Sequence, residues 1–313
     1  MNVHKLSEIG VENQEPEKLR DIREELNQLL ADRGITQAQV AKSLNISSSQ
    51  ISQYMAGKYA GNSEKTEQIL TSYIDREYKV QANRLDALEY YQTYNAKNIE
   101  KLCTMTHISK TMGVVIGRAG LGKTTALKHY AEKNAGTIYV EANMTYTSKN
   151  FLRSLGMQFY LGSQPTLFDF QMEIVERLKH TGRLMIIDQA EYLTEKSLDM
   201  IRTIHDNAGV GVVLAGLPLL ESNIKGKAGV NEQIYTRIFS KFVCKKLEMD
   251  DAGALITNYF PDAEEFSQKI LDASEGKIRV FAQLLMHAKR ITTNHNIKLN
   301  ESIINQIVKA RIS

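Results

Sequence analysis

The middle of the chain alternates between short apolar runs and longer segments in which apolar residues have a helical spacing. The apolar runs cover residues 114–116, 137–140, 184–187 and 210–215. Runs of this length, separated by helical patterns, are typical of parallel strands that are buried on both faces. The pattern predicts an α/β fold in which helices cover both faces of a parallel sheet.

Beyond Met249 the pattern changes, and every apolar repeat has the period of a helix. The expected helices cover residues 252–259, 263–273, 278–291 and 301–312. Because no strand-like run interrupts them, we expect a small all-helical lid after the sheet.

Two short helices joined by a tight turn are predicted within residues 35–58, ITQAQVAKSLNISSSQISQYMAGK. Asn45 suits the turn because asparagine tolerates the left-handed backbone conformation. Ser47 and Gln50 have the spacing of a capping box, which would start the second helix. The segment resembles the helix-turn-helix of the lambda-repressor type. Its expected inward-facing residues are Val40, Ala41, Leu44, Ile46, Ile51, Tyr54 and Met55.

The second helix of this pair would turn outward a polar face that suits a DNA major groove. Since that face holds no arginine, we expect little discrimination between bases, with Lys42 and Lys58 contacting phosphates. A small helical bundle with a polar surface and no DNA partner would give the same pattern. The expected DNA-facing residues are Ser48, Ser49, Gln50, Ser52 and Gln53.

A glycine-rich turn joins the first apolar run to the helix after it. Residues 117–124 read GRAGLGKT, which fits the phosphate-binding pattern G-x-x-x-x-G-K-[ST]. Glycines let backbone N–H groups surround an anion, Lys123 would neutralise the β- and γ-phosphates, and Thr124 would bind Mg²⁺. We therefore expect ATP and Mg²⁺ as ligands. The expected nucleotide-binding residues of this turn are Gly117, Arg118, Ala119, Gly120, Leu121, Gly122, Lys123, Thr124 and Thr125.

Asp188 directly follows the apolar run 184–187, so it is expected at the carboxyl end of a strand, beside the Mg²⁺ bound by Thr124. The core in this respect resembles AAA+ ATPases, in which a glutamate that activates water usually follows this aspartate. Here Gln189 follows it, and the next carboxylate is Glu191. Two alternatives stay open: Glu191 reaches the water, or Gln189 merely orients it and hydrolysis is slow.

The same resemblance singles out residues further along the chain. Arg237 and Lys241 lie in EQIYTRIFSKF, an expected helix at the end of the core, and Arg237 would reach the nucleotide of a neighbouring subunit. The alternative for Arg237 is a solvated surface base. Arg279 would contact the phosphates from the lid. Leu217 stands where such proteins commonly carry a γ-phosphate sensor, and its side chain forms no hydrogen bond.

Composition narrows the class of protein. With 313 residues, 42% of them hydrophobic, the chain is long enough for several compact domains, and a net charge of +3 does not by itself indicate a polyanionic partner. Cys103 and Cys244 are far apart in sequence, which argues against a disulfide framework or a zinc site. No signal-peptide pattern and no membrane-spanning apolar run are present, so a cytoplasmic protein without membrane contact is expected.

Four domains are expected from these patterns. They are a helix-turn-helix DNA-binding domain at residues 1–75, a helical connector at 76–97, an AAA+ P-loop core at 98–248 and a helical lid at 249–313.

In this order the segments resemble, nearly end to end, the AAA+ target-capture ATPases of Mu-type phage transposition. The likeness rests on NISSSQISQYMAGKYAGN, GRAGLGKT, LMIIDQAEYL, RIFSKF and GKIRVFAQLL. It implies a protein that binds double-stranded DNA with ATP and without sequence specificity, forms a helical homo-oligomer on it, and delivers it to a cognate transposase. DNA would then follow the ATPase core, where the loop MTYTSKNFLRSL offers Thr147, Lys149 and Arg153 as phosphate contacts.

Two functions of other classes are left open by the sequence. The chain would also suit a transcription regulator, in which the head reads an operator and the ATPase switches it. It would equally suit an ATPase of secretion or plasmid maintenance whose appendage holds a protein. A single palindromic footprint on DNA would favour the regulator, and a lack of DNA affinity would favour the second alternative.

Overall fold

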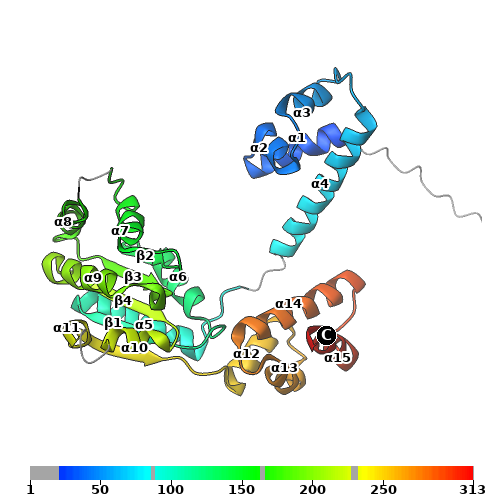
Figure 1. Ribbon diagram of the computed structural model, residues 1–313. Helices are drawn as coiled ribbons and strands as arrows, with labels where there is room; N and C mark the ends of the chain where they lie inside the picture. Colours follow the sequence, from blue (N-terminus) through cyan, green and yellow to red (C-terminus); the bar gives the residue numbers. More distant parts are fainter. Residues whose placement is uncertain (1–20, 86–88, 163–165, 227–231, 313) are drawn as a thin grey trace, which may run out of the picture. The chain divides into compact units, whose positions relative to one another are not determined.

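The computed structural model describes residues 21–85, 89–162, 166–226 and 232–312. The chain divides into two compact units, Met1–Ala87 and Leu88–Ser313, whose elements are labelled in Figure 1. Residues 1–20 of the expected head and 86–88 of the expected connector lie outside the described residues. None of the described helices combines the length and the apolar character needed to cross a membrane.

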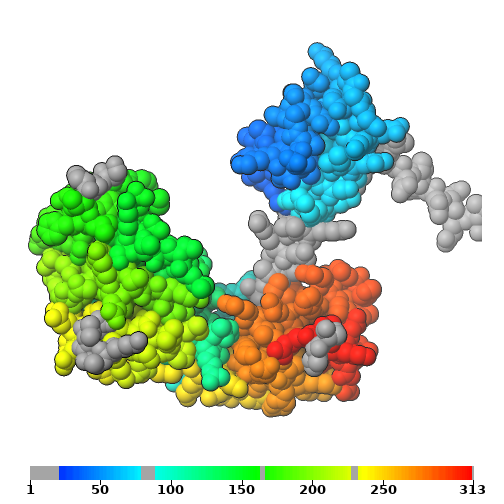
Figure 2. All heavy atoms as spheres, in the orientation of Figure 1, coloured from blue at the N-terminus to red at the C-terminus, as the bar shows by residue number. Residues whose placement is uncertain are grey.

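Within residues 21–85, the part of the first unit that the structure describes, four helices surround a small apolar core. They are α1 (Ile22–Arg33), α2 (Gln37–Leu44), α3 (Ser48–Met55) and α4 (Ser63–Leu85). The core between these helices contains the fully buried residues Leu26, Ile51, Leu70 and Ile74. Figure 2 shows the outer surface of this unit in blue and cyan. Helix α4 runs past residue 75, where the head was predicted to end, and continues to residue 85.

The turn between α2 and α3 has the conformation that the sequence predicts. Asn45 adopts the left-handed region with φ 53°, and this conformation ends α2. Its N–H bonds to the carbonyl oxygens of Ala41 and Lys42 near the end of the helix. Val40 and Ile51 are buried on either side of this turn. Tight packing of the two helices therefore depends on a residue that tolerates positive φ.

The cap of α3 differs from the predicted capping box. The Ser47 hydroxyl accepts a hydrogen bond from the N–H of Gln50 at 3.1 Å, as expected. The Gln50 side chain does not return that bond, because its Nε2 donates to Thr66 Oγ1 on α4 at 2.9 Å. Gln50 is therefore tied to the helix behind it and is not free on the outer face. The complete capping box lies at the start of α2, between Thr36 and Gln39.

The second unit contains a parallel sheet of five strands in the order β2-β3-β4-β1-β5. Four strands occupy the predicted apolar runs, which confirms the α/β fold class. The strands are β1 (Met112–Ile116), β2 (Thr137–Glu141), β3 (Leu184–Asp188), β4 (Gly211–Gly216) and β5 (Ile238–Val243).

The fifth strand lies where a helix was predicted, so the helical placement of Arg237 and Lys241 was wrong. Only α11 (Glu232–Tyr235) is helical in that segment, and Lys241 lies on β5 beside Val114 of β1. Burial alternates along β5 because it is an edge strand with one covered face. Such period-two burial is the mark of a strand.

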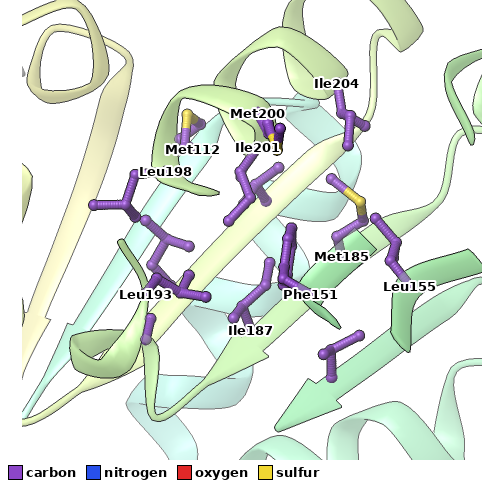
Figure 3. Packing of buried hydrophobic residues seen from close by; sticks show 14 of the residues in the cluster. Met112, Phe151, Leu155, Met185, Ile187, Leu193, Leu198, Met200, Ile201 and Ile204 are labelled. Carbon is purple, nitrogen blue, oxygen red and sulfur yellow. The ribbon is translucent and has the colours of Figure 1, made fainter. Parts of the chain in front are cut away.

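Helices cover both faces of the sheet, and adjacent strand residues point to opposite faces. On one face Val115, Ile186 and Val213 pack against α5 and α6. On the other face Met112, Met185 and Ile187 pack with residues of α7 and α9, as Figure 3 shows. The covering helices are α5 (Tyr94–Ser109), α6 (Lys123–Lys133), α7 (Ser148–Met157), α8 (Leu167–Leu178), α9 (Glu195–Ala208) and α10 (Leu219–Lys225).

The last part of the chain forms the predicted helical lid around its own apolar core. Phe281, Leu285 and Ile304 are fully buried in it. A 3₁₀ turn at Glu264–Phe266 leads into the second lid helix, so the expected helix over 263–273 consists of these two pieces. The lid helices are α12 (Met249–Tyr259), α13 (Ser267–Ser274), α14 (Ile278–His295) and α15 (Glu301–Ile312).

Candidate nucleotide-binding site

The GRAGLGKT segment forms a loop between the carboxyl end of β1 and the first turn of α6. Gly120 and Gly122 have φ values of 81° and 89°, which residues with a side chain rarely adopt. Gly122 begins α6 without a side-chain cap, so the first N–H groups of the helix are left for an anion. Gly117 approaches Cys244 so closely that a Cβ would lie 2.7 Å from the cysteine Cβ. The backbone of this loop therefore requires glycine at these positions.

Lys123 is buried within the loop that contains it. Its Nζ donates to the carbonyl oxygens of Gly117 at 2.6 Å and Arg118 at 3.1 Å. Burial lowers the pKa of the Lys123 amine, whereas the nearby Asp188 and Glu191 carboxylates act in the opposite direction. A buried cation with only carbonyl partners gains by binding an anion such as a phosphate.

Asp188 ends β3 and is 1% exposed. Its Oδ2 accepts hydrogen bonds from Thr124 Oγ1 at 2.6 Å and from the Tyr139 hydroxyl at 3.0 Å. Its Oδ1 accepts from the N–H of Gln189 at 2.8 Å. Burial and the adjacent Asp188 charge raise the pKa of Tyr139. Thr124 and Asp188 thus present two hard oxygen ligands at one point, which suits Mg²⁺.

The side chain of Gln189 is hydrogen-bonded to a residue of the adjacent strand. Its backbone is left-handed, with φ 54°, and its Nε2 donates to Oε1 of Glu141 at 2.6 Å. Glu141 ends β2 and is paired in register with Asp188. The other Glu141 oxygen, Oε2, lies 3.0 Å from Lys128 Nζ on α6. The side-chain amide of Gln189 is therefore in direct contact with the Glu141 carboxylate.

Glu191 lies on a 3₁₀ turn, Ala190–Tyr192, and its side chain is 9% exposed. Its Oε2 accepts a hydrogen bond from the backbone N–H of Leu217 at 3.2 Å. The carboxylate fits there because Gly216 has no side chain, since a Cβ at that position would lie 2.3 Å from Oε2. Glu191 thus joins the end of β3 to the end of β4, where the leucine contributes its backbone rather than its side chain.

The loop, the lid and the segment before α5 together enclose a cavity of about 510 Å³. The backbone N–H of Arg279, in the first turn of α14, donates to the carbonyl oxygen of Gly120 at 3.1 Å, and Arg279 lines the cavity. Buried Asn95 bonds to the carbonyl oxygens of Leu121 at 3.1 Å and Lys245 at 2.8 Å, which fixes the loop to the start of the lid. Apolar and aromatic side chains line part of the cavity: Tyr90, Tyr91, Leu255, Ile278 and Met286.

Arg237 lies outside this cavity. It precedes β5, and the next residue, Ile238, pairs with Met112 at the amino end of β1, whereas the P-loop follows the carboxyl end. The two ends of a five-residue strand are separated by roughly 15 Å. The guanidinium forms an ion pair with Asp206 at 2.7 Å. Contact with a nucleotide would therefore have to be made in another subunit.

The residues proposed for DNA are divided between the two units. In the first unit, Ser48, Ser49, Ser52 and Gln53 are exposed on α3, and Lys42 and Lys58 are exposed nearby. In the second unit, the predicted loop MTYTSKNFLRSL is largely helix α7. Thr147 caps this helix by accepting from the N–H of Asn150 at 3.2 Å, and Lys149 and Arg153 are exposed on it.

Several site residues had no motif to reveal them. Tyr139 and Glu141 belong to the strand TIYVE, and only the pairing of β2 with β3 brings them to Asp188. Tyr90 and Tyr91 belong to a segment that the sequence suggested was a connector. An alternating strand pattern that ends in a carboxylate was the one available signal, for Glu141.

Comparison with known proteins gives a family for the middle of the chain and relatives over most of its length. Residues 107–224 match the family described as an AAA domain. The chain is 25% identical to the Mu-like prophage FluMu DNA transposition protein B of Haemophilus influenzae, over 82% of this chain and 93% of that protein. It is 23% identical to the ATP-dependent target DNA activator B of Escherichia phage Mu, over 92% of this chain and 94% of that protein.

Among solved structures, the ORC2 protein of Aeropyrum pernix in its ADPNP-ADP complexes is similar with a TM-score of 0.53. The two share 15% identity over 71% of this chain and 68% of that one, so the likeness concerns the fold. The chain therefore contains an AAA domain with a P-loop core, and it is a homologue of the transposition B proteins of phage Mu and Mu-like prophages.

Proposed function

We propose that this protein is an ATPase that binds double-stranded DNA in an ATP-dependent manner with little sequence preference, forms filaments on it, and activates a transposase on the captured DNA. One observation carries the proposal: a P-loop whose Thr124 is bonded to Asp188 lies within a chain that aligns over 92% of its length with an ATP-dependent target DNA activator. The alternatives, an operator-binding regulator and a secretion or plasmid-maintenance ATPase, have no comparable support.

In this proposal ATP binds in the cavity between the P-loop and the lid. Backbone N–H groups at the start of α6 and the Lys123 amine bind the β- and γ-phosphates. Thr124 and Asp188 hold Mg²⁺, which when bound neutralises phosphate charge. Arg279 contacts the phosphates from α14, and Tyr90 is among the aromatic residues beside the base.

Hydrolysis in this site is expected to be slow. Gln189 accepts a hydrogen bond from water through its carbonyl oxygen, but an amide is too weak a base to take the proton. Glu191 also lines the cavity, yet its carboxylate is bonded to the Leu217 N–H. We therefore assign to Gln189 the orientation of the water, and to Glu191 a hydrogen bond that holds the end of β4.

A neighbouring subunit would complete the site. The Arg237 side chain is paired with Asp206 at the end of the sheet away from its own P-loop, so the phosphates it would reach are those of another copy. Such an arginine stabilises charge in the transition state of phosphoryl transfer. This arrangement would make assembly depend on bound ATP, as a filament on DNA requires.

DNA contacts are proposed on both units. The α3 residues Ser48, Ser49, Ser52 and Gln53 would approach a groove, with Lys42 and Lys58 on phosphates. On the second unit, Thr147, Lys149 and Arg153 of α7 would follow the DNA backbone. Neither set offers several arginines for base recognition, so the binding is expected to be indifferent to sequence.

The proposal is tested by measuring affinity for unrelated duplexes of several lengths, with ATP, with ADP and without nucleotide. The expected result is binding that requires ATP, strengthens with duplex length and is equal for different sequences. A footprint confined to one palindromic sequence would contradict the proposal in favour of a regulator. Absence of DNA binding under all conditions would contradict it in favour of an ATPase that acts on protein.

A further inference from the structure

The pairing of Glu141 with Gln189 gives the site a feature that the P-loop motif does not predict. The Gln189 Nε2 and the Glu141 Oε1 are 2.6 Å apart, and the two residues belong to the adjacent strand ends of β2 and β3. Gln189 lines the nucleotide cavity, whereas Glu141 is not among the residues that line it. Glu141 therefore touches the residue next to the substrate and not the substrate itself.

A carboxylate partner fixes which way a glutamine amide points. An ionised carboxylate only accepts hydrogen bonds, so the amide group facing it must be the NH₂ group. The carbonyl oxygen of Gln189 is then the atom left to accept a hydrogen bond from another group. With a partner that both donates and accepts, either face of the amide could point to the cavity.

The surroundings hold this arrangement from both sides. The backbone of Gln189 is left-handed and its N–H bonds to Asp188 Oδ1 at 2.8 Å, so the residue is anchored to the end of β3. Lys128 Nζ lies 3.0 Å from Glu141 Oε2, so that oxygen has its own partner and the other oxygen, Oε1, is the one that meets the amide. The side chains of both residues thus have a defined partner.

We propose that Glu141 is a positioning residue for ATP hydrolysis, which fixes the Gln189 amide so that its carbonyl oxygen orients the water attacking the γ-phosphate. The inference rests on the proposed function, from which it takes the hydrolysis of ATP. In the reaction a bond forms between the water oxygen and the γ-phosphorus while the bond from phosphorus to the bridging oxygen breaks. ADP leaves with the electron pair, and the water proton passes to the phosphate product. Gln189 accepts a hydrogen bond and takes no proton.

The test measures basal ATP turnover of the full chain, without DNA or transposase. Glu141→Ala is expected to lower kcat by about tenfold or more while KM for ATP changes by less than about twofold, because misplaced water costs rate rather than binding. Glu141→Gln, whose amide presents either its oxygen or its NH₂ group to Gln189, is expected to lie between the wild type and the alanine variant. Glu132→Ala removes an exposed carboxylate from α6 and serves as the matched control, with unchanged kcat.

A double variant separates positioning from general loss of structure. If Glu141 acts through Gln189, the Glu141→Ala, Gln189→Ala variant loses no more rate than Gln189→Ala alone. Losses that multiply in the double variant would overturn the inference, and so would a Glu141→Ala kcat within about twofold of the wild type. A wild-type chain that binds ATP without turning it over would overturn it as well. DNA binding is scored separately, so a chain that hydrolyses ATP but captures no DNA would contradict the proposed function alone.

Discussion

The Lys123 side chain carries a positive charge of the P-loop into the buried part of the site. Its amine is buried, and among the described residues its hydrogen-bond acceptors are two carbonyl oxygens of its own loop. A phosphate offers a stronger partner than two carbonyls, because it adds the attraction of a full negative charge to hydrogen bonds whose donor is already ionised. The residue is thus held in place for an anion before the anion arrives.

Replacing this lysine tests the site at its centre. Lys123→Ala should reduce ATP affinity by at least about tenfold, since one charge-assisted contact of more than about 1.4 kcal/mol is lost, and should abolish ATP-dependent DNA binding. Titration with a fluorescent ATP analogue and a DNA-binding assay check the two effects. Lys133→Ala, at the exposed far end of the same helix, is the matched control and should bind normally. Unaltered DNA binding by the Lys123 variant would contradict the assignment.

Arg237 provides a second test among single residues. If it acts on the nucleotide of a neighbour, Arg237→Ala should lower turnover by about a hundredfold or more and weaken assembly, while ATP affinity is kept. Asp206→Asn breaks the ion pair within the chain but leaves the guanidinium, so turnover should persist. Steady-state hydrolysis and sedimentation measure the outcome. Normal turnover in the alanine variant would remove the proposed role.

The sequence predicted the residues of the site that belong to one continuous motif. GRAGLGKT and the strand that ends in Asp188 carry their chemistry in neighbouring positions, so spacing alone reveals them. The sequence did not predict Tyr139 and Glu141 as site residues, because only the pairing of β2 with β3 brings them to the site. Asn95 escaped because a single asparagine that bonds to three backbone groups leaves no pattern in sequence.

Secondary structure was predictable where the periodicity was strong. The strands β1, β3 and β4 are continuous apolar runs buried on both faces, and the edge strand β2 was predicted from its alternating apolar residues between two helical patterns. The strand β5 was mistaken for a helix because it lies at the sheet edge, where polar Lys241 lies on the exposed face with Phe239 and Val243, and polar Ser240 lies on the covered face. Its apolar residues lie at positions 238, 239, 242 and 243, a spacing that fits a helix continued from the short one before it, and only the burial in the folded sheet alternates.

The turn between α2 and α3 allows a test of how this pair of helices is specified. Asn45 is left-handed, with φ 53°, and alanine is disfavoured in that region by about 1 kcal/mol. Asn45→Ala should lower the free energy of unfolding of the first unit by about that amount, whereas Asn45→Gly should be neutral or slightly stabilising. Urea unfolding of residues 1–87 measures both. Equal stability of the alanine and glycine variants would show that the turn does not require this conformation.

At the scale of the whole molecule, the two compact units divide the proposed work. The residues that line the nucleotide cavity, including those of the lid, belong to the second unit. Removal of residues 1–87 should therefore leave ATP affinity unchanged and weaken DNA binding, because the contacts proposed on α3 are lost. Parallel nucleotide and DNA titrations of the truncated and full chains check this. Undiminished DNA affinity would assign the first unit another role.

The central claim is that ATP held between P-loop and lid joins subunits, and that the resulting assembly binds duplex DNA. Electron microscopy of the full chain on long duplex DNA, saturated with a non-hydrolysable ATP analogue, tests it most directly. The account predicts continuous helical filaments with the analogue, and bare DNA with ADP or without nucleotide. Protein that remains monomeric and leaves the DNA uncovered when saturated with the analogue would contradict it.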